Sequence, residues 1–89
     1  MSRSTLDLRD ALFIASTRGQ KYVIAVYRDR NGTYSSEEYT SGKSTSRSTG
    51  HTLDQIKLVV RKTIHFAALY DGINYEVYLD SLGISQSPA

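Results

Sequence analysis

The N-terminal part of the chain carries apolar side chains at helical spacing. Four of them fall at positions i, i+3, i+4 and i+7 of one helical face: Leu8, Ala11, Leu12 and Ala15. Ser4 stands where an N-cap side chain accepts a hydrogen bond from the first helical turn, and Gly19 offers the left-handed conformation in which helices commonly end. The pattern therefore predicts a helix over residues 5–17.

The next two segments predict a β-hairpin. Residues 21–27 are apolar at both alternating sets of positions, which is typical of a strand in the centre of a sheet. Asn31-Gly32 follows, and this pair favours a two-residue loop because a type I′ turn needs positive φ at both of its central residues. Residues 33–40 form the second strand, which is polar enough to lie at an edge of the sheet.

A two-residue loop also determines which residues of the two strands face each other. It pairs Arg28 with Ser35 and Ile24 with Tyr39. In this register two arginines and two tyrosines share one face of the hairpin: Arg28, Arg30, Tyr22 and Tyr39. Basic groups interleaved with aromatic rings are typical of nucleic-acid-binding surfaces.

The segment over residues 40–50 has almost no apolar character. Nine of its eleven residues are serine, threonine or glycine, and the other two are Lys43 and Arg47. Such a composition predicts a mobile loop, because little of it gains from burial. Lys43 and Arg47 on a flexible chain could follow a phosphate backbone.

The main helix begins after Thr52, which forms a capping box with Gln55. Its core face lies within an arc of about 80° on a helical wheel and consists of Leu53, Ile56, Val60, Ile64 and Ala67. We expect Tyr70 to border this face, and Asp71-Gly72 to end the helix.

A second stripe lies on the opposite side of the same helix and consists of Leu58, Lys62, His65 and Leu69. Apolar surface opposite a core face needs a cover. One interpretation is that the stripe docks a partner protein or a second copy of the chain. The other is that the N-terminal helix packs over it.

Residues 73–80 alternate between apolar and polar side chains, which predicts a half-buried strand. The expected element order is α-β-β-α-β. A right-handed return through the main helix would place the last strand beside the first. We therefore expect an α+β fold with a three-stranded mixed sheet, in order 2-1-3, packed with two helices. Residues 1–80 form one domain, and residues 81–89 form a frayed tail.

Composition excludes several kinds of chemistry. The 89 residues include no cysteine, so the chain has no disulfide, thiolate nucleophile or cysteine-bound zinc. No apolar run reaches the roughly 18 residues of a membrane helix, and no signal peptide is apparent, so we expect a cytoplasmic protein without membrane contact. His51 and His65 have no convergent acid and nucleophile in the sequence, so we expect no enzymatic activity, metal or cofactor.

Charge is unevenly distributed along the chain. The net charge is +2, but every lysine and arginine lies at or before Lys62, and only acidic charges follow it. The candidate binding residues come from the basic hairpin and loop and from the outward stripe of the main helix. They are Arg28, Arg30, Tyr39, Lys43 and Arg47 on the hairpin and loop, and Leu58, Lys62, His65 and Leu69 on the helix.

We expect a small binding protein with no enzymatic activity. The leading hypothesis is a regulatory or inhibitory protein that occludes a surface of a larger protein or nucleoprotein complex, as anti-CRISPR proteins and other phage or mobile-element inhibitors do. The alternative is direct binding of DNA or RNA by the basic hairpin and loop. A third hypothesis is a small phosphorylated ligand held between the loop and the sheet.

Overall fold

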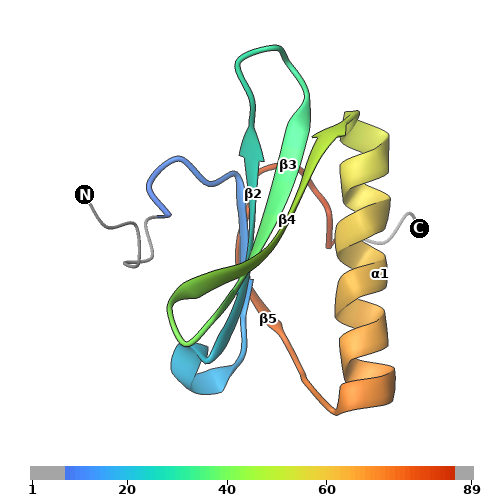
Figure 1. The fold of residues 1–89 in the computed structure, drawn as a ribbon. Helices are drawn as coiled ribbons and strands as arrows, with labels where there is room; N and C mark the ends of the chain where they lie inside the picture. Colours follow the sequence, from blue (N-terminus) through green and yellow to red (C-terminus); the bar gives the residue numbers. More distant parts are fainter. Residues whose placement is uncertain (1–7, 86–89) are drawn as a thin grey trace.

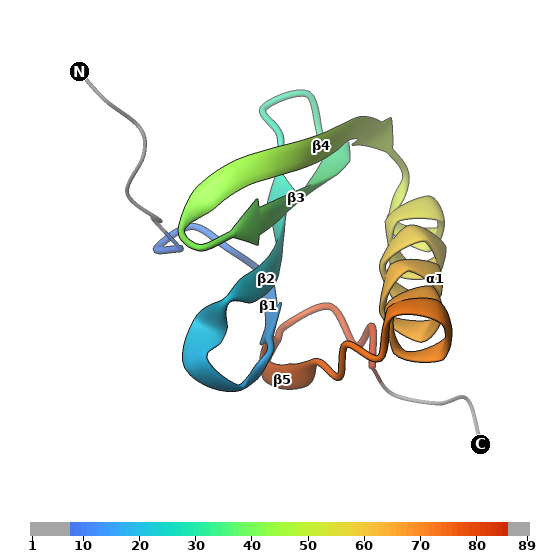
Figure 2. The ribbon, with the colours of Figure 1, turned by 60° about the horizontal axis from the view of Figure 1, so that its bottom comes forward.

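Five antiparallel strands and one long helix make up residues 8–85, the part of the chain that the computed structural model describes. The bounds are β1 Phe13–Ser16, β2 Tyr22–Arg28, β3 Tyr34–Thr40, β4 Lys43–His51, α1 Leu53–Asp71 and β5 Glu76–Asp80, with a short 3₁₀ turn η1 at Arg18–Gln20. The strand order is β4-β3-β2-β1-β5. The helix lies across one face of this sheet (Figures 1 and 2).

The prediction of a three-stranded sheet with two helices is wrong, and the first reason lies near the N-terminus. Within the described residues, the segment predicted as a helix contains β1 instead, which pairs with β2 on one side and with β5 on the other. Phe13 and Ala15 are fully buried on the face that α1 covers. The helix propensity of a short segment stabilises it less than this strand pairing and burial do. Gly19 has φ 81° but serves the turn between β1 and β2, and Ser4 lies outside the described residues.

The second reason is that most of the loop expected over residues 40–50 belongs to a strand, because residues 43–51 form β4. Ser41 and Gly42 have φ values of 52° and 82°, so this pair turns the chain with positive φ at both positions. Thr40 and Lys43 then face each other across the turn. The strand needs no buried side chains, because its backbone groups pair with those of β3.

The hairpin of β2 and β3 is confirmed, but its register differs from the prediction by one residue. Gly32 has φ 86°, whereas Asn31 lacks a positive φ, so the loop contains three residues rather than two. The N–H of Asp29 donates to the Thr33 carbonyl at 2.7 Å. Arg28 consequently faces Tyr34, and Val23 faces Tyr39. Tyr39 therefore lies on the opposite sheet face from Arg28 and Tyr22.

Helix α1 confirms the sequence prediction at both ends. The Thr52 side chain accepts from the Gln55 N–H, and the Gln55 side chain accepts from the Thr52 N–H. Gly72 ends the helix in the left-handed conformation. Ile56 and Val60 are buried against the sheet, together with residues of β1 and β2.

Side chains of β2 are buried on both faces of the sheet, as its apolar run predicts. Ile24 and Val26 face α1, whereas Val23 and Ala25 face the other side. There they pack with Ala11, which precedes β1, and with Tyr39.

The chain after β5 is packed as far as it is described. Ile84 is 1% exposed and belongs to the core cluster under α1. Asp80 accepts hydrogen bonds from the N–H groups of Ile84 and Ser85, and the Nε of Arg61 donates to the Ile84 carbonyl at 2.7 Å. The prediction of a frayed tail is therefore wrong for residues 81–85. Residues 86–89 lie outside the described part.

Ile84→Ala should lower the free energy of unfolding by about 2–5 kcal/mol, because it removes a fully buried side chain and leaves a cavity. Urea denaturation followed by circular dichroism measures the change. Leu69→Ala is the control, because this leucine is exposed on α1 and its loss should change stability by less than about 0.5 kcal/mol. Equal effects from the two variants would show that Ile84 does not belong to the core.

Candidate functional site

The structure does not bring the predicted basic residues together. Arg28 and Arg30 lie at the turn between β2 and β3, whereas Lys43 begins β4 at the opposite end of β3. At roughly 3.3 Å per residue, β3 separates these ends by about 20 Å. Arg47 lies in the middle of β4 opposite Glu37. The hairpin and the segment after it thus form no compact basic patch in the described residues.

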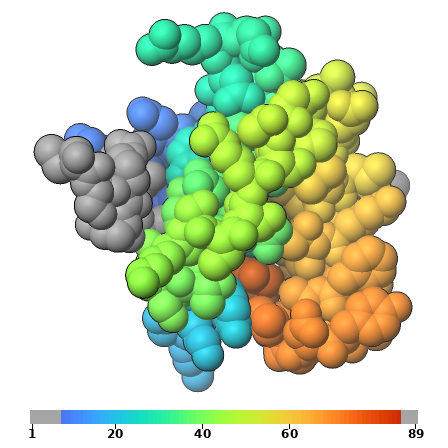
Figure 3. Space-filling view, viewed as in Figure 1, coloured from blue at the N-terminus to red at the C-terminus, as the bar shows by residue number. Residues whose placement is uncertain are grey.

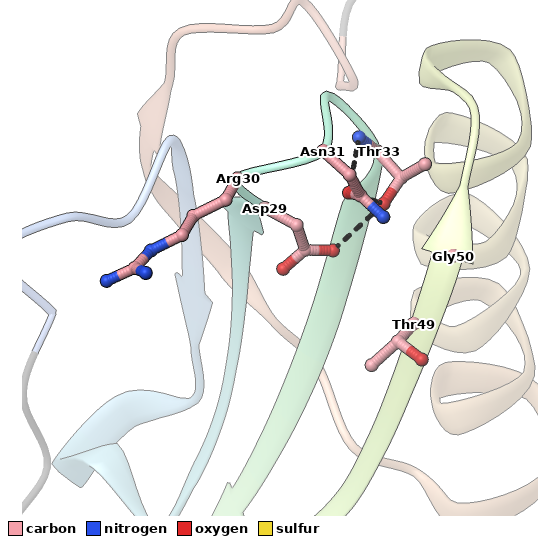
Figure 4. Close-up of a pocket in the computed structure, with 6 residues that line it drawn as sticks. All are labelled: Asp29, Arg30, Asn31, Thr33, Thr49 and Gly50. Atoms are coloured by element: carbon pink, nitrogen blue, oxygen red, sulfur yellow. Dashed lines mark hydrogen bonds between the residues drawn. The ribbon is translucent and has the colours of Figure 1, made fainter.

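A pocket of about 400 Å³ lies beside the turn between β2 and β3, but its polar groups bind one another (Figure 4). Asp29 accepts from the hydroxyls of Thr33 and Ser35, at 3.2 and 2.9 Å. Asn31 accepts from the N–H and the hydroxyl of Thr33. Figure 4 shows Arg30 extending away from β4. These contacts stabilise the turn and engage the side chains of Asp29, Asn31 and Thr33.

The stripe predicted on α1 is exposed. Leu58 and Leu69 are 52% and 60% exposed, and Lys62 and His65 between them are also exposed. The interpretation in which a helix over residues 5–17 covers this stripe is wrong for the described residues, because they contain no such helix.

Two aromatic residues that the sequence analysis did not select as binding residues lie beside this stripe. Phe66 is 47% exposed, and its ring centroid lies 5.6 Å from that of His65. Tyr70, expected to border the core, is 74% exposed, with its ring centroid 5.7 Å from that of Phe66. On a helical wheel at about 100° per residue, Phe66 lies between the stripe and the core arc, and Tyr70 lies nearer the arc. We call Leu58, Lys62, His65, Phe66 and Leu69 the outer face of α1.

A groove of about 360 Å³ lies between the C-terminal half of α1 and the sheet. In Figure 3 it lies in the lower half, between the green strands and the orange end of the helix. Its lining includes four aromatic rings and two carboxylates: Tyr22, Phe66, Tyr70, Tyr75, Glu38 and Asp71. These residues come from β2, β3, α1 and the segment before β5.

The helix C-cap places one wall of this groove. Gly72, with φ 66°, and Ile73 both donate their N–H groups to the carbonyl of Ala67. These bonds turn the chain back under the end of the helix. Ile73 and Tyr75 thereby line the groove beside β2 and β3.

Glu38 is the charged residue of the groove lining on the sheet side. Burial raises the pKa of the Tyr75 hydroxyl, and the charges of Glu38 and Tyr22 raise it further. Neither Glu38 nor Asp71 has a side-chain hydrogen bond or ion pair within residues 8–85. The groove thus holds two carboxylates without a cationic partner among the described residues.

The described residues contain a serine–histidine contact but no metal-binding cluster. The Ser48 hydroxyl lies 2.5 Å from Nε2 of His51, but no acidic side chain in residues 8–85 orients this ring. No group of three or more His, Asp or Glu side chains in that range could hold a metal ion. No helix of the described chain is both long and apolar enough to cross a membrane.

Comparisons with known proteins identify no relative. No protein-family model, no curated protein and no solved structure matches the chain.

Glu38→Gln should lower the pKa of Tyr75, because it removes a negative charge that disfavours the phenolate. Glu37→Gln is the matched control. Glu37 neighbours Glu38 but points to the other sheet face, where burial, Tyr27 and Glu37 itself raise the pKa of Tyr39. NMR of tyrosine labelled with ¹³C at Cζ resolves the two hydroxyls. If Glu37→Gln instead lowers the pKa of Tyr75, the register of β3 is wrong.

Proposed function

We propose that this chain is a non-enzymatic regulatory or inhibitory protein that binds a larger protein or nucleoprotein complex and occludes a surface of it. The observation that carries the proposal is the outer face of α1. Leucine and phenylalanine side chains lie exposed there on a 19-residue helix that is capped at both ends. Several large apolar side chains exposed on one face of a helix are a common mark of a protein interface.

The composition of the outer face resembles an interface with a few anchoring residues. Phe66 and Leu69 offer large apolar side chains that a partner pocket can bury, and Lys62 and His65 offer polar contacts beside them. The side chains project from a helix fixed in the core by Ile56 and Val60, so little conformational freedom of the backbone is lost on binding.

Charge on the outer face favours a different protein over a second copy. Its ionisable groups are Lys62 and His65, with no carboxylate among its residues. Two such faces packed together would bring like charges into contact, which costs free energy. A partner with acidic residues around an apolar pocket matches the face better. A homodimer through α1 is therefore the less favoured arrangement.

Direct nucleic acid binding has less support from the geometry. The basic residues that would contact phosphates lie at opposite ends of β3, and Tyr39 is largely buried on the sheet face opposite Arg28.

Titration against labelled single- and double-stranded DNA and RNA separates the two functions. We expect no saturable binding at 50 mM salt, because the cations are dispersed. Salt-dependent binding in the micromolar range or tighter, weakened by Lys43→Ala with Arg47→Ala, would make nucleic acid the partner instead. Fluorescence anisotropy measures both outcomes.

Leu58→Ser with Leu69→Ser should abolish formation of a stoichiometric complex with the protein partner while leaving the fold intact. The reason is that both leucines are exposed and contribute little to the core. The partner is first captured from lysate of the source cell, then purified and mixed with each variant for light scattering. Tyr78→Ser is the control, because Tyr78 is an exposed apolar residue on β5. Undiminished binding by the double variant would contradict the proposal.

A further inference from the structure

We infer that the groove under the C-terminal half of α1 binds the guanidinium group of an arginine side chain supplied by the partner protein. The source of this arginine rests on the proposed function. Binding of a guanidinium group by the groove does not rest on the proposed function, because it is argued from the residues that line the groove.

The aromatic walls provide the first part of the argument. Tyr22, Phe66, Tyr70 and Tyr75 line a volume of about 360 Å³, large enough for a planar side-chain head group. The faces of aromatic rings attract cations within about 6 Å of the ring centroid.

The carboxylates provide the second part. Glu38 on β3 and Asp71 at the end of α1 contribute the charged side chains of the groove lining. Neither has a cationic partner within residues 8–85, although the chain as a whole carries a net charge of +2. Glu38 and Tyr75 line the same groove, where burial raises the pKa of Tyr75 and the negative charge of Glu38 adds to it. A cation entering from outside would therefore be attracted by both walls.

An arginine fits this arrangement better than a lysine. Its guanidinium group is flat and weakly hydrated, so it stacks on aromatic faces, and it donates five N–H groups in a fixed geometry that matches carboxylates. A lysine ammonium is more strongly hydrated and loses more on entering an aromatic site. The groove combines both features that select for guanidinium.

The position of the groove connects it to the proposed interface. Phe66 lies at its margin and also belongs to the outer face of α1, beside His65. A protein seated on the outer face would therefore lie next to the groove entrance. An arginine at the edge of that protein could extend past Phe66 and Tyr70 toward Glu38 and Asp71.

Titration of the ¹⁵N-labelled protein with N-acetyl-arginine amide tests the groove without the partner. We expect saturable chemical-shift changes at Tyr22, Glu38 and Tyr75, with a Kd in the millimolar range. N-acetyl-citrulline amide has nearly the same shape without the charge and should bind at least about fivefold more weakly. N-acetyl-lysine amide should also bind more weakly than the arginine compound.

Paired variants locate the site. Glu38→Gln and Tyr70→Leu should each weaken arginine binding about three- to tenfold, since one removes a carboxylate and the other a ring. Glu37→Gln and Tyr78→Leu make the same changes outside the groove and should leave binding unchanged. The inference is overturned by equal binding of arginine and citrulline or of arginine and lysine, by no saturable shift, or by equal effects of groove and control variants. These results do not depend on the complex that tests the proposed function.

Discussion

The fold depends on the burial of β2 on both faces. Val23 and Ala25 face one side while Ile24 and Val26 face the other, so this strand is stable only if both faces and both edges are covered. β1 and β3 pair with its edges, α1 covers one face, and Ala11 and Tyr39 cover the other. The pairing of β1 with β2 also explains why a segment with helical spacing becomes a strand, since Phe13 and Ala15 complete the layer under α1.

The helix creates both candidate surfaces because only part of it packs closely. Its fully buried residues, Ile56 and Val60, lie in its N-terminal half. The chain must pass from β4 at one edge of the sheet to β5 at the other, and α1 makes this crossing. Its C-terminal half leaves Phe66 and Tyr70 exposed and a groove beside β2 and β3. The outer face and the groove are thus two sides of one incompletely buried helix.

The sequence predicts those elements whose signals are local. The capping box of Thr52 and Gln55 and the terminal Gly72 determine both ends of α1. The predictions are wrong where the structure depends on pairing between separate segments of the chain. Asn31-Gly32 permits both two- and three-residue loops, and the choice between them shifts the whole register of β3. Residues of β4 lack apolar side chains, so their strand follows from backbone pairing to β3, which composition does not reveal.

The candidate sites also differ in whether local sequence signals are enough to predict them. The exposed stripe on α1 could be predicted, because helical spacing alone places Leu58 and Leu69 opposite Ile56 and Val60. The groove could not be predicted, because its residues meet only when β2 and β3 take the observed register. A shift of one residue would turn Glu38 to the other sheet face, away from Tyr75. The charge that attracts a cation to the groove therefore depends on a three-residue turn at the far end of the same hairpin.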